Sequence, residues 1–174
     1  MQKIKGKKAF LLGEETIKIV IALICILFLA YLLISLYYSK IRDEKSQQAQ
    51  ATLNGDGVGS IKTIIGRVMT NQGNLGGNSE RLVIHNPQGW TIFSFFVSNV
   101  KPNSCSNSKC ICVCDEVSDF SIKALSNSKE ERQAEECDEN GACLIVPELR
   151  KFDNIHITES SEVLIKNDGG ITLT

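Results

Sequence analysis

This chain has almost no net charge and very few histidines. Its 174 residues carry 19 lysines and arginines against 20 aspartates and glutamates, a net charge of −1, and include only two histidines. With no excess of one sign to attract a polyanion, we expect no nucleic-acid partner. His85 and His156 both fall within predicted strands, outside any HExxH motif, and the sequence has no GxSxG motif. We therefore expect neither an enzyme nor a bound cofactor.

A glycine-rich stretch lacks the features of a phosphate or calcium loop. NGDGVGS, residues 54–60, follows a predicted helix and contains no lysine, whereas a phosphate-binding loop follows a strand and carries one. Asn54 and Asp56 are too few ligands for an EF-hand calcium loop. We interpret residues 54–59 as a flexible, glycine-rich hinge.

Charge is absent from the whole of IVIALICILFLAYLLISLYY, residues 19–38. At a rise of about 1.5 Å per residue, ~20 apolar residues span the roughly 30 Å hydrocarbon core of a bilayer. The run exceeds the ~7–15 residues of a signal-peptide core, so we expect a retained single-pass anchor. A basic segment, residues 1–13, precedes a predicted helix over residues 14–53, which comprises the transmembrane helix and a helical stalk.

The basic residues around the apolar run predict its orientation. Four lysines lie in residues 1–8, and three basic residues follow the run in residues 40–45. Because loops rich in lysine and arginine stay on the cytoplasmic side, we expect a cytoplasmic N-terminus and an extracytoplasmic C-terminal domain. The protein would then sit in the cell membrane with the lipid bilayer as its partner.

Six of the seven cysteines lie outside the apolar run, at Cys105, Cys110, Cys112, Cys114, Cys137 and Cys143. An even number suits a disulfide framework. The stretch KCICVC alternates cysteine with isoleucine and valine, which predicts a strand with three cysteines on one face. Same-face positions lie ~6.6 Å apart along a strand, whereas the sulfurs of a tetrahedral zinc site lie only ~3.8 Å apart. We therefore expect disulfides rather than a metal site, with zinc and redox-active thiols as the alternatives.

The connectivity of these cysteines stays open at the level of sequence, because six cysteines allow 15 pairings. Asn140-Gly141 predicts a tight three-residue turn, with Gly141 left-handed, that would place Cys137 opposite Cys143. Those two could pair with each other, or both could reach the CICVC strand. A disulfide-bearing domain belongs on the oxidising side of a membrane, in agreement with the orientation above.

Residues 60–174 are predicted to form the extracytoplasmic domain, a mainly-β sandwich or small barrel. Polar residues 70–80 and 126–136 are predicted surface loops, and residues 162–174 a hairpin around Asn-Asp-Gly-Gly. Residues 90–98, apolar on both faces, are predicted as a central strand. The expected strands are residues 60–69, 81–85, 90–98, 109–114, 120–125, 143–147 and 154–158, together with the two strands of the hairpin.

The beginning of the chain resembles type IV pilins and archaeal pilin-like proteins. The resemblance rests on KGKKAFLLG, residues 5–13, then EETIKIVIALICILFLAYLLIS, residues 14–35, and a β-rich remainder. It implies cleavage after Gly13, with Glu14 as the new N-terminus, and bundling of the helices into a filament. The sequence departs from the family pattern at Leu12, where a charged residue is usual, and at Lys18, where a glutamate is usual. After the membrane run, few apolar residues are available to dock the helix onto a sheet.

The same outline is similar to small uncharacterised single-pass membrane proteins of archaea with an exported, cysteine-bearing β domain. Three functions follow from the sequence. The first is a membrane-anchored cell-surface protein with a structural or adhesive β domain. The second is a pilin-like filament subunit processed after Gly13, and the third a membrane-tethered thiol-redox or metal-binding protein. Copies of itself or other surface proteins are the candidate protein partners.

Overall fold

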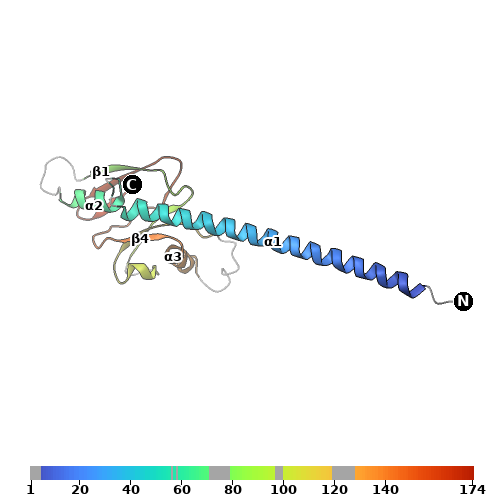
Figure 1. The fold of residues 1–174 in the computed structure, drawn as a ribbon. Helices are drawn as coiled ribbons and strands as arrows, with labels where there is room; N and C mark the ends of the chain where they lie inside the picture. Colours follow the sequence, from blue (N-terminus) through green and yellow to red (C-terminus); the bar gives the residue numbers. More distant parts are fainter. Residues whose placement is uncertain (1–4, 56, 58, 71–78, 97–99, 119–127) are drawn as a thin grey trace. The chain divides into compact units, whose positions relative to one another are not determined.

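The computed structural model describes residues 5–55, 57, 59–70, 79–96, 100–118 and 128–174 (Figure 1). The chain divides into two compact units, Met1–Ile41 and Arg42–Thr174. The described residues of the first unit are helical, and the second unit contains the sheets and the disulfides. Each unit is described by itself below.

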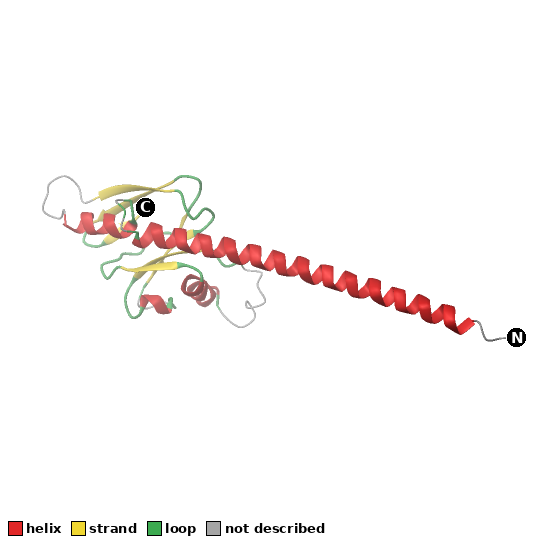
Figure 2. Cartoon of the chain, in the orientation of Figure 1, coloured by secondary structure: helices red, strands yellow, loops and turns green. Residues whose placement is uncertain are grey.

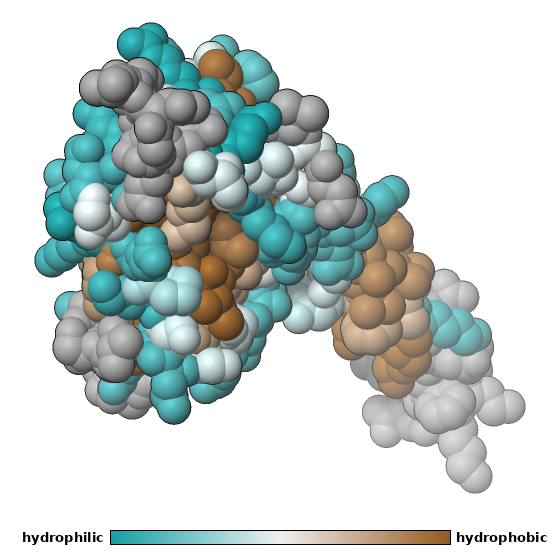
Figure 3. Space-filling model, turned by 90° about the vertical axis from the view of Figure 1, so that its left-hand side faces the viewer, coloured by the Kyte–Doolittle hydropathy of each residue, from teal (hydrophilic) through white to brown (hydrophobic). Residues whose placement is uncertain are grey.

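Helix α1, Lys5–Asn54, forms the first unit and continues into the second (Figure 2). Its stretch Thr16–Asn54 contains an 18-residue apolar window, none of which is buried within the chain. Large apolar side chains such as Leu27 and Leu33 are about two-thirds exposed, and they give this part of the helix its hydrophobic surface (Figure 3). The structure thus confirms a helix long and apolar enough to cross a membrane.

Two antiparallel sheets form the framework of the second unit. The first has the order β1-β6-β7 and consists of β1 (Ser79–Ile84), β6 (Ser161–Asn167) and β7 (Ile171–Leu173). The second has the order β4-β3-β2-β5 and consists of β4 (Ala142–Ile145), β3 (Cys110–Cys114), β2 (Thr91–Phe95) and β5 (Ile155–His156). The described helices of this unit are the end of α1, α2 (Ile61–Thr70), α3 (Lys129–Glu139) and a 3₁₀ turn, η1 (Asn103–Cys105).

Both sheets contribute to one main apolar core. Ile111 and Val113 of β3 belong to it, as do Val163 and Ile165 of β6, all with no exposed surface. Helix α2 and the end of α1 complete this core. The prediction of a β-sheet domain with disulfides is confirmed, but the domain is a mixture of helices and two separate sheets. Burial of helical apolar faces, rather than further strands, completes its core.

The end of α1 packs onto this domain, contrary to the expectation of little docking. Ala49 and Leu53 are fully buried in the main core. The Thr52 hydroxyl donates a hydrogen bond to the Asn86 carbonyl at 2.8 Å, and the Lys45 ammonium donates one to the Gln88 carbonyl at 3.1 Å. Two small or medium apolar side chains, four residues apart, are enough to seat one turn of a helix. The flexibility predicted for residues 54–59 stays a prediction.

The strand predicted over residues 60–69 is wrong, because this segment is helix α2. Its buried residues, Ile61, Ile64, Ile65 and Val68, follow the spacing of one helical face. At the start of the helix the Ser60 side chain accepts a hydrogen bond from the Thr63 amide at 3.3 Å. The β-branched residues that suggested a strand are here buried along a helix.

The surface loop predicted over residues 126–136 is also wrong where the structure describes it, because Lys129–Glu139 form α3. The Ser128 hydroxyl accepts from the Glu131 amide at 3.2 Å, and the Glu131 carboxylate accepts from the Ser128 amide at 3.0 Å. This reciprocal pair is a capping box, whose S-x-x-E pattern is visible in the sequence.

The other strand predictions are confirmed where the residues are described. Strands β1, β2, β3, β4 and β5 lie within or across the predicted segments, and β2 is an inner strand as expected. Strands β6 and β7 pair as the predicted antiparallel hairpin, with Gly169 and Gly170 at positive φ in its turn. The strand predicted over residues 120–125, and most of the loop predicted over residues 70–80, lie outside the described residues.

Candidate functional site: a cysteine cluster on one strand

Strand β3 presents two chemically different faces. Ile111 and Val113 face the main core, whereas Cys110, Cys112 and Cys114 belong to a second buried cluster. All five residues are fully buried. The alternation CICVC therefore produces the two faces that the sequence predicted.

The structure pairs all six cysteines of this unit through β3. Cys105 of η1 is bonded to Cys110, with Cα atoms 5.7 Å apart. Cys143 of β4 stands directly opposite Cys112 in the strand register and is bonded to it, with a Cα separation of 4.1 Å. The third disulfide joins Cys114 to Cys137 of α3 at 5.0 Å. Of the two arrangements open for Cys137 and Cys143, the structure has the one in which both reach the CICVC strand.

These disulfides make most of a second hydrophobic cluster. Its remaining members are Phe93 and Phe95 of β2 and Ala134 of α3. The cysteines are essentially buried except Cys143, which is only partly buried on the edge strand β4. The cluster attaches η1 and α3 to the sheet face opposite the main core.

Gln133 of α3 is a residue that the sequence analysis missed. Its side-chain nitrogen donates to the Asp115 carbonyl at 2.7 Å and lies 3.4 Å from the Cys114 sulfur. Its side-chain oxygen accepts from the Val117 amide at 3.0 Å. A buried amide that is satisfied on both sides positions α3 beside the Cys114–Cys137 disulfide. Once α3 is identified by its capping box, the position of Gln133 four residues before Cys137, on the same face of the helix, is the signal for this role.

Asp138 performs a similar role for η1. Its carboxylate accepts from the Ser104 amide at 2.9 Å and from the Asn103 side-chain amide at 3.0 Å. Partial burial alone would raise the pKa of Asp138, but the hydrogen bonds from Ser104 and Asn103 outweigh it, and the pKa is lowered. The charged carboxylate therefore attaches η1 to α3 at neutral pH.

Gly141 is needed because another segment packs closely against it, and it does not adopt the left-handed conformation that the sequence predicted. The expected three-residue turn is wrong, because Glu139 ends α3, Asn140 caps it, and Gly141 is not among the glycines at positive φ. A Cβ at Gly141 would lie 2.7 Å from the Cys114 Cβ and 2.8 Å from the Val113 carbonyl oxygen. Glycine is therefore required here by the close approach of the α3–β4 connection to β3.

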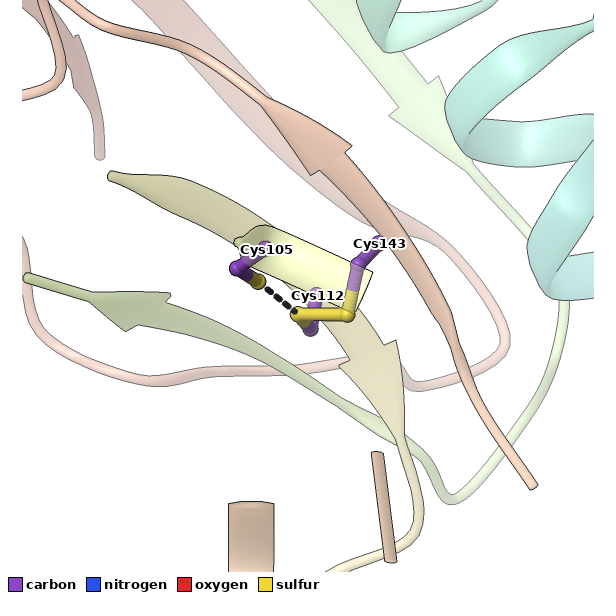
Figure 4. Close-up of side chains that lie close together, drawn as sticks. All are labelled: Cys105, Cys112 and Cys143. Carbon is purple, nitrogen blue, oxygen red and sulfur yellow. Dashed lines mark hydrogen bonds between the residues drawn. A yellow bond between two sulfur atoms is a disulfide. The ribbon is translucent and has the colours of Figure 1, made fainter. Parts of the chain in front are cut away.

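Two of the disulfides lie against each other. The Cys105 and Cys112 sulfurs are 3.7 Å apart (Figure 4), and the Cys110 and Cys112 sulfurs are 3.9 Å apart. Strand β3 is unbroken across these positions. Same-face cysteines on this strand therefore lie closer together at their sulfurs than the expected ~6.6 Å spacing, because side chains lean along the strand. The expectation that they lie too far apart for one metal is wrong.

Each of the two histidines has a ring nitrogen in contact with an oxygen of a neighbouring segment. The His85 Nδ1 lies 3.0 Å from the Glu159 carbonyl oxygen, and the His156 Nδ1 lies 3.0 Å from the Thr91 hydroxyl. Both contacts connect neighbouring segments of the fold. Gly13 and Glu14, the candidate processing site, lie within α1; cleavage between them stays a prediction.

Comparison of the chain with protein-family models, with curated proteins and with solved structures finds no match. Its function is therefore inferred from its own residues.

Proposed function

We propose that this chain is a single-pass membrane protein of the cell surface, whose disulfide-bearing domain lies outside the membrane as a structural or adhesive module. The anchor is the apolar stretch of α1, and the module is the unit from Arg42 onward. Under this proposal the domain has a structural or adhesive role, in which it presents a cross-linked surface to copies of itself or to other surface proteins.

One observation carries the proposal: an apolar window without a buried residue lies in the same chain as three disulfides in a single small domain. About 20 exposed apolar residues are stable only when something covers them, and a bilayer covers a helix on all sides. Disulfides persist on the oxidising side of a membrane and are rare in reducing compartments. The two features together support an anchored, exported domain.

Intact cells that express the full chain test this topology by lysine labelling. Lys62 and Lys151 are exposed in the domain, whereas Lys3, Lys5 and Lys7 precede the apolar run. A membrane-impermeant amine reagent should modify the first pair on intact cells, and should modify the N-terminal lysines only after the membrane is opened. Labelling of the N-terminal lysines on intact cells, with Lys62 and Lys151 protected, would reverse the proposed orientation.

A pilin-like filament subunit is a second candidate, favoured by the docking of Ala49 and Leu53 into the domain core. A filament built from bundled helices needs each domain held on its helix, and this docking supplies that attachment. The candidate requires cleavage after Gly13. The intact mass of protein isolated from membranes should then lack the first 13 residues, and Gly13→Val should restore the full-length mass. A full-length wild-type chain would exclude this route to a filament.

A further inference from the structure

Four sulfurs from three segments converge in the second cluster. They belong to Cys105 of η1, Cys110 and Cys112 of β3, and Cys143 of β4. Those of Cys105, Cys112 and Cys143 all lie within 4.8 Å of one another. The fourth, on Cys110, is bonded to Cys105 and lies 3.9 Å from Cys112.

The spacing between the two disulfides already suits a tetrahedral metal site. Zinc bound to four thiolates at ~2.3 Å holds its sulfurs ~3.8 Å apart. The two contacts between the disulfides, 3.7 Å and 3.9 Å, have that length without any movement. Once the bonds are reduced, the partners within each disulfide would need to separate. The Cys110 sulfur, which lies outside the group within 4.8 Å, would also need to approach that of Cys143 by rotation of the side chains.

The surroundings of the sulfurs also suit a structural site. Cys105, Cys110 and Cys112 have no exposed surface, and Cys143 is partly buried at the edge of the sheet. A soft, thiophilic ion fits a donor set of thiolates, and a closed four-ligand site is the structural form of zinc. The partly buried Cys143 marks the side from which an ion would enter.

We propose that, when the Cys105–Cys110 and Cys112–Cys143 disulfides are reduced, these four sulfurs bind one thiophilic divalent metal ion such as Zn²⁺. The metal then joins η1, β3 and β4 in place of the two covalent bonds. The same sulfurs thus cross-link the second cluster in oxidising surroundings by disulfides and in reducing surroundings by a metal.

A phosphine can reduce the two disulfides to the four thiols that the metal site needs. Two phosphine molecules supply four electrons, each taking an oxygen atom from water to become a phosphine oxide, and the two disulfides become four thiols. Binding of the ion then releases four protons as the thiols become thiolates.

The third disulfide provides a matched control within the same protein. Cys114 and Cys137 form a separate disulfide and lie outside the group of Cys105, Cys112 and Cys143, although Cys114 is on the same strand and both are buried. The main apolar core contains none of the cysteines, so we expect the reduced protein to retain its fold. Far-UV circular dichroism checks this before any metal is added.

The test is an anaerobic titration of Co²⁺ into the full chain in detergent after phosphine reduction, followed by displacement with Zn²⁺. Reduced wild type and Cys114→Ser/Cys137→Ser should each bind one Co²⁺ with the absorption of a tetrahedral four-thiolate site, whereas oxidised wild type should bind none. Cys105→Ser/Cys143→Ser should lose this spectrum. Should that double variant fail the fold check, Cys143→Ser alone should change the spectrum to that of a three-thiolate site.

If adding Co²⁺ leaves the absorption spectrum of reduced wild type unchanged, the proposal is overturned. Equal loss of the four-thiolate spectrum in Cys105→Ser/Cys143→Ser and in Cys114→Ser/Cys137→Ser would also overturn it. The proposal depends on the sulfur geometry and not on membrane orientation. Its failure would therefore leave the lysine-labelling result untouched, and the reverse also holds.

Discussion

The sulfur atoms of Cys110 and Cys112 lie 3.9 Å apart, although both residues belong to one face of an unbroken strand. Each cysteine is bonded to a different segment, Cys105 of η1 or Cys143 of β4. A single strand is thereby cross-linked to two neighbours at adjacent points. The third disulfide extends this arrangement to α3.

Removal of the disulfides one at a time should cost unequal amounts of stability. The bonds Cys112–Cys143 and Cys105–Cys110 close loops with sequence separations of 31 and 5 residues. By the loop-entropy relation, replacing the first pair with alanine should lower the free energy of unfolding by ~3–4 kcal/mol, and the second by ~2 kcal/mol. Urea unfolding of the full chain in detergent measures both. A larger loss from the short loop would contradict this order.

Leu53→Ala should destabilise the domain, because Leu53 is fully buried in the main core. Truncation of a buried leucine costs ~2–5 kcal/mol through lost transfer energy and the cavity left behind. Leu36→Ala on the same helix is the matched control, since Leu36 is 66% exposed. Urea unfolding should separate the two variants, and equal midpoints would mean that the end of α1 does not dock onto the domain.

Alanine at two glycines should have opposite effects. Gly141→Ala places a Cβ 2.7 Å from both the Cys114 Cβ and the Cys137 carbonyl oxygen, so we expect a loss of ~1–3 kcal/mol as in other overpacked sites. Gly66→Ala in α2 meets nothing within 4 Å and should stabilise by ~0.5–1 kcal/mol, because alanine is the better helix former. Thermal unfolding compares both with wild type, and a neutral Gly141→Ala would show that the α3–β4 connection can shift.

The lowered pKa of Asp138 predicts a loss of stability in acid. A carboxyl group whose folded pKa is depressed contributes stability at pH values above its unfolded pKa of 3.8, and this contribution is lost as the pH falls through the lower folded pKa. The stability difference between wild type and Asp138→Asn should therefore be present at pH 6 and shrink below pH ~4.

Urea midpoints across the pH range 2.5–6 measure this difference. Asn103→Ala removes one donor to the carboxylate and should reduce the acid-dependent part without abolishing it, because the Ser104 amide remains. A pH-independent difference between wild type and Asp138→Asn would show that the charge of Asp138 contributes nothing.

Local patterns in the sequence predicted much of the architecture correctly. An uninterrupted apolar run, a glycine-containing hairpin and a two-faced cysteine strand depend on interactions between near neighbours, so their patterns can be read directly. Helix α2 shows where the pattern was ambiguous. Ile61, Ile64 and Val68 have helical spacing, but their β-branched side chains also favour strands. For α3, the S-x-x-E pattern of Ser128 and Glu131 indicates a helix start, whereas the high polarity of the segment favours a surface loop.

By itself, the sequence determined that a long apolar helix precedes a cysteine-rich domain, and that three cysteines share one face of a strand. Only the tertiary structure decided which cysteines pair, because pairing depends on how η1, α3 and β4 are brought to β3 from 5, 23 and 31 residues away. The same is true of Leu53, which is buried only because the domain folds against the end of α1. Sulfur–sulfur distances belong to this second class as well, since they follow from side-chain directions that no spacing along the chain defines.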